Sequence, residues 1–342
     1  MLRLPAEWEH SDFLLIAWPH AATDWNYMLD DVCRCYTDLV RAATRFGTVI
    51  IATPEPDAVK ERLIAEGIDT AKCILAEVPT NDTWARDFGP ITMVDENYAP
   101  TLLDFKFNGW GLKFASDKDN LITRRLYQSG VLKGDYANRL NFVLEGGSIE
   151  SNGRGTLLTT SECLLSLNRN GQFTRNEIEQ YLKDAFNVTN VLWLDHGALA
   201  GDDTDSHIDT LARLAPDNAI LYVKCSDTTD EHFAGLQAME KQLQQMKDER
   251  RVAFKLYPLP MPEAIYDEDG ERLPATYANF LIFNGAVLVP TYNQPENDNA
   301  ALATVQSAFP GYEVVGVDCR ALIRQHGSLH CVTMQLPGQS VN

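Results

Sequence analysis

The feature of this sequence that most constrains its fold is a recurrence of predicted helix starts about every 60 residues. Helix patterns begin near Glu55, Asp117, Thr174, Asp230 and Glu296, so consecutive starts lie 56 to 66 residues apart. A structural period of this size is typical of repeat architectures, even where the units share no evident sequence identity. The sequence therefore predicts one supersecondary unit that is used five times.

Each unit contains a hairpin, a helix and a strand, in that order. The hairpins are clearest around Asn284-Gly285 and Asn152-Gly153, because Asn-Gly between short apolar runs is the strongest two-residue hairpin signal. A capping box, Thr174 followed by Glu177, marks the start of one helix. The predicted strands after the helices are residues 48–52, 71–78, 188–194, 252–257 and 312–317. Five such units either close into a ring around a shared centre or lie in an open α/β sheet.

Chain length favours the ring. The chain has 342 residues, which fits one closed ring of five units better than two independent domains, so we predict a single domain over residues 1–342. A chain of this size buries most of its apolar surface and needs no disulfide or metal ion to fold. One segment, residues 258–274, has the composition of a loop, and the sequence does not decide between an ordered lid and a mobile loop.

Cysteine usage and hydropathy predict a cytoplasmic protein. The seven cysteines are an odd number without the spacing of a disulfide framework, which suits a reducing compartment. The longest unbroken apolar run, residues 13–18, is six residues long, far below the roughly 20 that cross a bilayer. The N-terminal residues also lack the apolar core of a signal peptide, so we expect no membrane segment.

The net charge restricts the partners of the chain. It carries 29 Lys and Arg against 48 Asp and Glu, a formal net charge of −19 at pH 7. Such a surface repels the phosphates of nucleic acids and of anionic membranes, so we expect neither as a partner. A small cationic substrate is attracted instead, although a high charge also serves solubility alone.

Four polar clusters occupy the same phase of the repeat, directly after the strand that follows a helix. These clusters are residues 83–90, 144–148, 201–209 and 326–331. In a ring of units, equal phase places all four clusters at one end of the central axis. The repeat therefore predicts a single site built from segments that are far apart in the sequence.

Cys331 is the candidate nucleophile of this site. A thiolate attacks best where a neighbouring cation or imidazolium lowers the thiol pKa, although on residue type alone a buried cysteine is more often a packing residue. Adjacent residues on a strand point to opposite faces, so we expect His330 to be structural. His207 is the better partner, because His207 and Asp209 would share one face of a strand and form an acid–base pair.

Two further clusters offer carboxylates for a cation. The Trp84 ring could stack on a flat cation whose N–H groups donate to Asp87, although Arg86 beside a packed tryptophan could equally form a structural ion pair. Glu145 precedes Gly146-Gly147, and these glycines permit close backbone approach. These residue types suit a guanidinium, which is planar and permanently charged.

Together the candidate residues suit hydrolysis of a guanidinium group. Asp87 and Asp209 would hold its N–H groups and orient its carbon, and Cys331 would attack that carbon. His207 would protonate the departing ammonia and then deprotonate the water that releases the product as a urea. This route needs neither a metal ion nor an organic cofactor.

Two other functions remain open from the residues alone. A metal-dependent hydrolase could use carboxylates and an imidazole as ligands, although the spacing fits neither an EF-hand loop nor a pair of helix-spaced histidines. Its ligands would be Asp202, Asp203, Asp205 and His207. A non-catalytic binder of cationic amines could use the same acidic residues. Sensitivity to a chelator would identify the first function, and saturable binding without turnover the second.

The chain resembles the agmatine deiminase family and, more distantly, the bacterial-type peptidylarginine deiminases of the same guanidine-modifying superfamily. The resemblance rests on separated motifs in the same order, and it extends nearly from end to end of the chain. The motifs are residues 4–9 (LPAEWE), 17–20 (AWPH), 84–90 (WARDFGP), 145–149 (EGGSI), 201–205 (GDDTD), 207–209 (HID) and 329–333 (LHCVT).

The resemblance implies the pentein fold, a five-bladed α/β propeller of pseudo-fivefold repeated ββαβ units, which agrees with the period. It implies hydrolysis of agmatine to N-carbamoylputrescine and ammonia through a covalent amidino-cysteine intermediate, without a metal or cofactor. Matched by position, Cys331 resembles the nucleophile and His207 the acid and base. Asp87 and Asp209 resemble the guanidinium clamp. The positions that resemble substrate-binding residues are Trp84, Glu145 and Asp203.

Two departures from the family pattern leave the substrate open. Family members often have a Gly-rich stretch and an Asn before the His-Cys pair, where this chain has residues 325–329 (QHGSL). Gly is also common where Ser206 precedes His207. The alternative substrate is free or peptidyl arginine, which would need a cation to meet a carboxylate or a backbone carbonyl. The sequence does not define the oligomeric state, and a homo-oligomer is possible.

Overall fold

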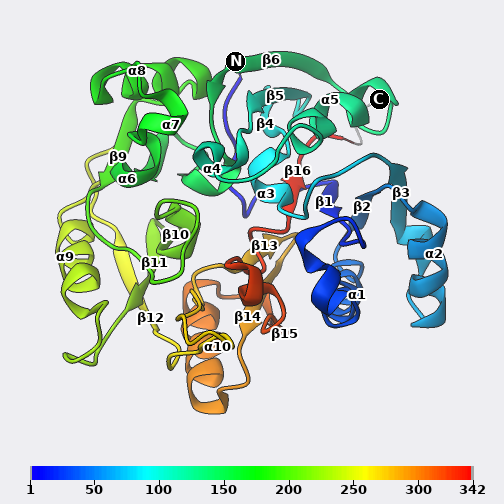
Figure 1. The fold of residues 1–342 in the computed structure, drawn as a ribbon. Helices are drawn as coiled ribbons and strands as arrows, with labels where there is room; N and C mark the ends of the chain where they lie inside the picture. The colour runs from blue at the N-terminus through cyan, green and yellow to red at the C-terminus, as the bar shows by residue number, and fades with distance from the viewer. Residues whose placement is uncertain (1, 340–342) are drawn as a thin grey trace.

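The computed structural model describes residues 2–339, and these contain five small β-sheets arranged around a central axis (Figure 1). The longer helices lie outside the sheets, so the arrangement is a ring of five α/β blades (Figure 1). The pentein propeller predicted from the sequence is therefore confirmed, and the alternative of an open α/β sheet is wrong.

Four blades share one ββαβ topology. Their first two strands are antiparallel, and the second and third strands are parallel with a helix between them. The strands are β4 (Ile91–Val94), β5 (Pro100–Lys106) and β6 (Asp135–Val143) in the second blade, β7 (Ile149–Ser151), β8 (Thr156–Thr160) and β9 (Asn190–Leu194) in the third, β10 (Ala212–Ala215), β11 (Ala219–Lys224) and β12 (Lys255–Pro260) in the fourth, and β13 (Leu281–Phe283), β14 (Ala286–Thr291) and β15 (Glu313–Asp318) in the fifth. The connecting helices are α5 (Ile122–Gln128), α8 (Arg175–Phe186), α9 (Phe233–Leu243) and α10 (Pro295–Ala308).

The first blade closes the ring by joining the two ends of the chain. Its strands, in the order β16-β1-β2-β3, are β16 (Met334–Leu336), β1 (Phe13–Ala17), β2 (Thr48–Thr53) and β3 (Cys73–Glu77). β16 runs antiparallel to β1, with Leu336 opposite Phe13, and α1 (Leu29–Ala43) connects the parallel strands β1 and β2. These elements form the ββαβ unit of this blade, and α2 (Pro56–Ala65) with β3 is an addition to it. The helix predicted near Glu55 is thus the added helix, while the helix equivalent to those of the other blades is α1.

Short helical elements connect the blades, and most of them lie near the ends of the strands. The short α-helices are α3 (Ala85–Phe88), α4 (Gly109–Leu112), α6 (Ser161–Leu164) and α7 (Leu167–Asn170). The 3-10 helices are η1 (Asp24–Met28), η2 (Thr70–Lys72), η3 (Asp119–Leu121), η4 (Gly146–Ser148), η5 (Ile208–Thr210) and η6 (Leu322–Gln325). Of these, α3, η4 and η5 overlap with the polar clusters that were predicted to meet at one end of the central axis.

The predicted helices and strands are confirmed, although several begin later than expected, such as β3 at Cys73 and α5 at Ile122. The capping box of α8 is formed, because Thr174 accepts a hydrogen bond from the Glu177 amide and Glu177 accepts one from the Thr174 amide. The strand predicted over residues 252–257 begins later, at Lys255. Asp248 accepts hydrogen bonds from two amides of the preceding segment and folds it into a turn.

The two Asn-Gly signals give different turns. Asn284 and Gly285 both have positive φ, 47° and 81°, and connect β13 to β14 with Phe283 opposite Ala286, as predicted for a two-residue hairpin. Asn152-Gly153 also lies between paired strands, but its loop is longer. The Asn152 side chain accepts hydrogen bonds from the amides of Arg154 and Thr156, and this holds the wider loop.

Two hydrophobic clusters stabilise the ring. One contains residues of all five blades together with α1, α9 and α10, and the other packs the second and third blades against α8. No helix among residues 2–339 is both long and apolar enough to cross a membrane. The segment 258–274 is ordered: Arg272 pairs with Asp230 and Glu231. Gly201 lies so close to this segment that a Cβ would come within 2.3 Å of the Arg272 carbonyl oxygen.

Substitution of Gly285 by alanine should destabilise the protein by about 1 kcal/mol, because a Cβ is strained at positive φ. Gly235 is the matched control, since it is exposed within α9 and has no positive φ, and a Cβ there would meet no neighbouring side chain within 4 Å. Gly235→Ala should stabilise by about 0.5–1 kcal/mol. Urea denaturation of both variants measures the difference, and effects of the same sign would contradict the turn geometry.

Candidate active site

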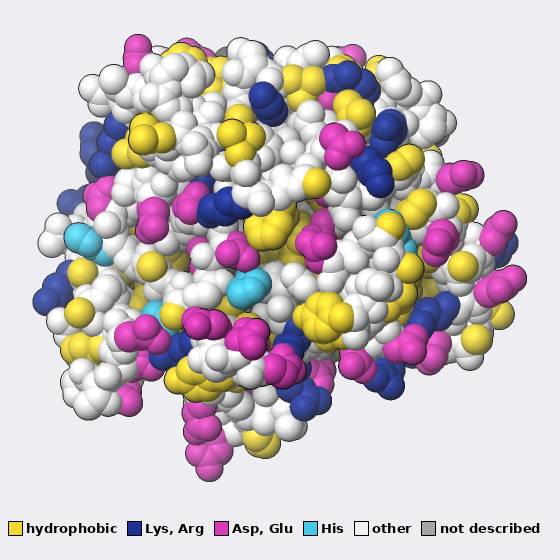
Figure 2. Space-filling view, in the orientation of Figure 1, with side chains coloured by type: hydrophobic (Ala, Val, Ile, Leu, Met, Phe, Trp, Pro, Cys, Tyr) yellow, Lys and Arg dark blue, Asp and Glu magenta, His cyan; other side chains and the backbone are white. Residues whose placement is uncertain are grey.

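A cavity at the centre of the ring brings together three of the four polar clusters. It encloses about 440 Å³, and acidic side chains surround the centre of this face of the molecule (Figure 2). Its walls are formed by four carboxylates, three aromatic rings and a thiol, together with polar residues of the loops. The lining residues are Asp24, Asp82, Trp84, Asp87, Trp110, Phe114, Asp203, Thr204, Gln325, His326, Gly327 and Cys331.

Cys331 lies in a turn rather than on the predicted strand. The Thr333 amide donates to the His330 carbonyl oxygen, and the Arg86 amide donates to the Cys331 carbonyl oxygen, so residues 330–333 are folded before β16 begins. His330 and Cys331 nevertheless point to different sides, as alternation predicted. The Cys331 Sγ atom lies 3.3 Å from Asn279 Oδ1 and 3.8 Å from Asp209 Oδ2.

His207 has a different carboxylate partner from the one predicted. The prediction of a shared strand face for His207 and Asp209 is wrong, because these residues lie at the start of η5, a 3-10 helix. Its tighter turn directs Asp209 to His330, whose Nδ1 donates to Asp209 Oδ2 at 2.7 Å. The Nδ1 atom of His207 lies 3.6 Å from Asp87 Oδ1 instead.

Asp87 is held by two donors. Trp110 Nε1 donates to Asp87 Oδ2 at 2.9 Å, and the Gly147 amide donates to Asp87 Oδ1 at 3.1 Å. Trp110 reaches this position from a strained backbone with φ of 54° in α4. A Cβ at Gly147 would lie 2.7 Å from His207 Nδ1 and 2.9 Å from Asp87 Oδ1. Gly147 is therefore required by the close approach of η4 to the imidazole and the carboxylates, and Gly146 by its approach to the backbone of Arg86, whose carbonyl oxygen would lie 2.2 Å from a Cβ.

Only one of the two carboxylate oxygen atoms of Asp209 is hydrogen-bonded to a described residue. Its Oδ2 atom accepts the hydrogen bond from His330, whereas Oδ1 is buried and has no hydrogen-bond partner among the described residues. A buried carboxylate oxygen without a donor is costly, so this atom keeps an unused capacity to accept an N–H donor.

Burial shifts the ionisation of the three reactive groups. It raises the pKa of Asp87 to about 6, because the nearby Asp209 and Glu145 offset the attraction of His207. Burial alone would lower the pKa of His207, but Asp87, Cys163 and Glu145 raise it to about 10. Burial and the carboxylates of Asp209 and Asp87 raise the pKa of Cys331 well above its ordinary value. Near neutral pH the empty site therefore contains an imidazolium and a thiol.

The three predicted substrate-binding residues lie in different places. Trp84 lines the cavity and packs against Trp110, with ring centroids 6.5 Å apart. Asp203 lines the rim, and its side chain is 43% exposed. Glu145 is fully buried behind the cavity, where Arg169 Nε donates to it at 2.8 Å, and its charge raises the pKa of both Asp87 and His207.

Asn279 is a site residue that the sequence reasoning missed. Its Oδ1 atom accepts hydrogen bonds from the amides of His330 and Cys331, and its Nδ2 donates to the Asp209 carbonyl oxygen. It follows β12, which makes it the fifth segment in the phase that the four clusters share. The phase alone could have indicated this position, although an Asn between apolar residues carries no signal of its own.

The metal-ligand set considered from the sequence does not converge. Asp205 is paired with Arg169 and Lys113, and Asp202 accepts hydrogen bonds within its own loop. Two other triads of potential ligands lie close together among the described residues, Glu145–Cys163–His207 and Glu7–Glu150–His330. An arginine already binds carboxylates in each triad, Arg169 in the first and Arg213 in the second.

Known proteins share both the sequence and the fold. Residues 3–337 match the family described as Porphyromonas-type peptidyl-arginine deiminase. An agmatine deiminase of Stutzerimonas stutzeri is 30% identical over 99% of this chain and 96% of its own. A solved structure of a Porphyromonas gingivalis protein provisionally named an arginine deiminase is 49% identical, with a TM-score of 0.93 and 99% of both chains covered. A cysteine-to-serine variant of C. jejuni agmatine deiminase with substrate bound is 37% identical, with a TM-score of 0.90 over 98% of this chain and 96% of that chain.

The family match covers nearly the whole chain, and the propeller and the motif order agree with it. This chain belongs to the Porphyromonas-type peptidyl-arginine deiminase family, in the group with the agmatine deiminases that its motifs resemble.

Proposed function

We propose that this chain hydrolyses agmatine to N-carbamoylputrescine and ammonia. The observation that carries the proposal is the charge of the cavity that leads to Cys331. Asp24, Asp82, Asp87 and Asp203 line it, and none of the described lining residues is Lys or Arg. Such a cavity favours a substrate that is cationic along its whole length.

The same charge distribution favours agmatine over arginine. Agmatine has a guanidinium at one end and an ammonium at the other, whereas free arginine carries a carboxylate that needs a cationic partner. Two cations lie close to the cavity, Lys113 at the surface and Arg169 in the interior, but both are paired with Asp205. The names of the S. stutzeri and C. jejuni relatives also support agmatine.

In the proposed complex the guanidinium lies between Asp87 and Asp209. Its N–H groups donate to the free Oδ1 of Asp209 and to the carboxylate of Asp87, and these bonds orient the carbon toward Cys331. Bidentate contact between a guanidinium and carboxylates is strong and directional. Trp84 and Trp110 offer aromatic faces to the cation and the methylene chain, and Asp203 offers a carboxylate near the mouth for the ammonium.

The bound cation also activates the nucleophile. The pKa of Cys331 is raised by burial beside two carboxylates, and a guanidinium between those carboxylates offsets their charge and favours loss of the thiol proton to solvent. The thiolate attacks the guanidinium carbon, and the His207 imidazolium donates a proton to the departing ammonia. Neutral His207 then removes a proton from water, which attacks the amidino-cysteine and expels the thiolate.

Replacing Cys331 by alanine should abolish ammonia release from agmatine, because no other group can form the covalent intermediate. Stability should change by about 1 kcal/mol, as for removal of a small buried atom. Cys73→Ala is the matched control, since Cys73 is half-buried on β3 outside the cavity and its loss should leave the rate unchanged. A rate near that of the unmodified protein in Cys331→Ala would refute the mechanism, and loss of activity with a chelator would favour a metal-dependent route.

Agmatine should be hydrolysed with a higher kcat/KM than free arginine or a peptidyl arginine at equal concentration. The physical reason is the cost of placing a carboxylate or a neutral backbone beside Asp203 and Asp82 without a cationic partner. Quantification of the urea-containing product for the three substrates measures this. A preference for free arginine would instead agree with the provisional name of the P. gingivalis protein, and a preference for peptidyl arginine with the description of the family.

The kcat/KM for agmatine should rise with pH from 5 toward 10, because the Cys331 thiol must lose its proton, and it should fall most steeply below about 6, where Asp87 becomes protonated. Asp87 must be ionised to attract the guanidinium, and its pKa is raised to about 6. His207 must be protonated to release ammonia, and it stays protonated over this range because its pKa is raised to about 10. Burial also raises the pKa of Asp82 to about 6. In Asp82→Asn the loss of activity at low pH should remain, which assigns this loss to Asp87. A flat profile from pH 5 to 8 would exclude the role of Asp87.

A further inference from the structure

A second cavity lies on the other side of the backbone layer that carries the catalytic groups. It encloses about 550 Å³ and is lined by the N-terminal segment and β16. Arg86 and Gly146 line this rear cavity, whereas Asp87 lines the catalytic cavity and Gly147 donates to Asp87. Consecutive residues of the chain thus face opposite cavities, and one layer of side chains separates the two cavities.

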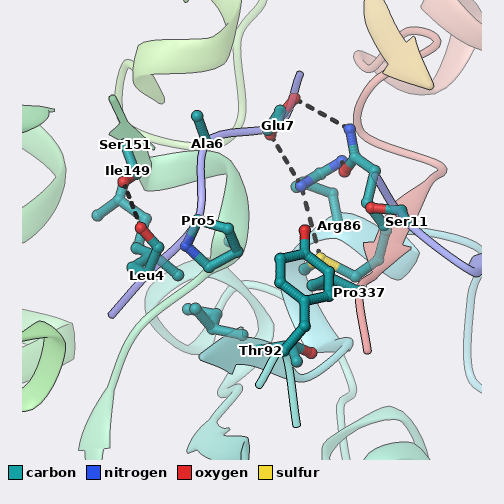
Figure 3. A pocket seen from close by; sticks show the side chains of 15 residues that line it. Leu4, Pro5, Ala6, Glu7, Ser11, Arg86, Thr92, Ile149, Ser151 and Pro337 are labelled. Carbon is teal, nitrogen blue, oxygen red and sulfur yellow. Dashed lines mark hydrogen bonds and ion pairs between the residues drawn. The ribbon is translucent and has the colours of Figure 1, made fainter. Parts of the chain in front are cut away.

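Glu7 reaches into this layer from the N-terminal segment. Its carboxylate accepts hydrogen bonds from Arg86 Nη1 at 3.1 Å, Arg213 Nη2 at 2.7 Å and Gln335 Nε2 at 3.1 Å. Figure 3 shows Glu7 and Arg86 joined by such a contact at the rear cavity. Glu7 belongs to the motif of residues 4–9, for which the proposed reaction supplies no role.

His330 connects Glu7 to the catalytic side. Its Nε2 lies 2.8 Å from Glu7 Oε1, and its Nδ1 lies 2.7 Å from Asp209 Oδ2. The ring is fully buried, and Asn279 fixes its backbone amide. Both ring nitrogens therefore face carboxylates, so the imidazole can neither rotate nor shift without losing a hydrogen bond on one side.

We propose that Glu7 and His330 are positioning residues that act on the substrate through Asp209. The chain of contacts Glu7–His330–Asp209 fixes the orientation of the Asp209 carboxylate, whose Oδ2 atom lies 3.8 Å from Cys331 Sγ. The inference rests on the proposed function, because it assigns these residues to the clamp of that same site. It makes the N-terminal segment part of the machinery that selects a cation.

The electrostatics of the buried clamp supply the physical reason. Burial alone would raise the pKa of Asp209, but the hydrogen bond and charge of His330, together with the charges of His207 and Arg213, lower it. Asp209 lies in a group with Asp87 and Glu145, which repel one another. Without His330, the second carboxylate of the clamp would lose its donor and its orientation, and substrate binding would weaken. Outer-layer partners of this kind typically change activity by about 10–100-fold.

The preference of Cys331 for a cationic alkylating agent tests the proposal. The readout is the ratio of the second-order rate constants for labelling Cys331 with 2-chloroacetamidine, a cation, and with 2-chloroacetamide, its neutral counterpart. Glu7→Gln should lower this ratio on the order of tenfold to a hundredfold, since misplacing a binding group by about 1 Å has effects of that size. Glu9→Gln is the matched control, because Glu9 lies on the same segment but binds Arg3 and the Ala6 amide, away from the site, and it should keep the ratio.

A second variant separates positioning from folding. Glu7→Gln leaves Arg86 and Arg213 short of a counter-charge, whereas His330→Gln breaks the chain of contacts while Glu7 still pairs with both arginines. The ratio should fall in both variants and should not fall further when either is combined with Asp209→Asn. A ratio equal to that of the unmodified protein in His330→Gln would overturn the proposal.

Agmatine turnover is measured in parallel. Absence of turnover in the unmodified protein would refute the proposed function, while the labelling ratio would still decide the role of Glu7 and His330.

Discussion

The centre of the ring is filled by paired charges, and this buried layer is the constraint on which the rest of the structure depends. Arg213 of β10 is fully buried, and its guanidinium donates to Glu7, Glu150 and the Phe280 carbonyl oxygen. Arg86 donates to the same carboxylate of Glu7. Removing one partner of a buried pair destabilises by about 3–5 kcal/mol. The partners come from different blades and from the N-terminal segment. These central charges are therefore compensated only when the ring is closed.

The catalytic cavity takes its rigidity from this layer. Arg86 and His330 belong to the layer, while the next residues, Asp87 and Cys331, face the cavity. A shift of either catalytic group would move a buried charge away from its partner. Stabilisation of a developing charge works best when the surrounding dipoles and charges are already in place. The propeller thus supports a site in which two carboxylates, an imidazolium and a thiol remain close together before a substrate arrives.

The ring and the convergence of the polar clusters could be predicted, because the spacing of the helix starts and the place of each cluster within its unit can be read directly from the sequence. The partner of His207 could not, because it depends on η5: a strand would have placed Asp209 beside it, and the 3-10 helix leaves Asp87 there instead. Asn279 was missed because the charged residues of the fifth segment lie in the loop that precedes it, and a single Asn between apolar residues marks no site. In the first blade the period was counted from the added helix α2 instead of α1, because a helix pattern in the sequence does not show which strands the helix connects.

The distribution of charge explains recognition better than its sum. Four of the 48 acidic residues, Asp24, Asp82, Asp87 and Asp203, line the cavity. Exposed charges farther than about 8 Å from a ligand are largely screened at physiological ionic strength, whereas buried charges are screened much less. The remaining acids therefore affect solubility and the rate of encounter, and the cavity residues determine which end groups a substrate carries. A single unpaired cation in the same wall would reverse that selection, which is why the pairing of Lys113 and Arg169 with Asp205 matters for the choice between an ammonium and a carboxylate.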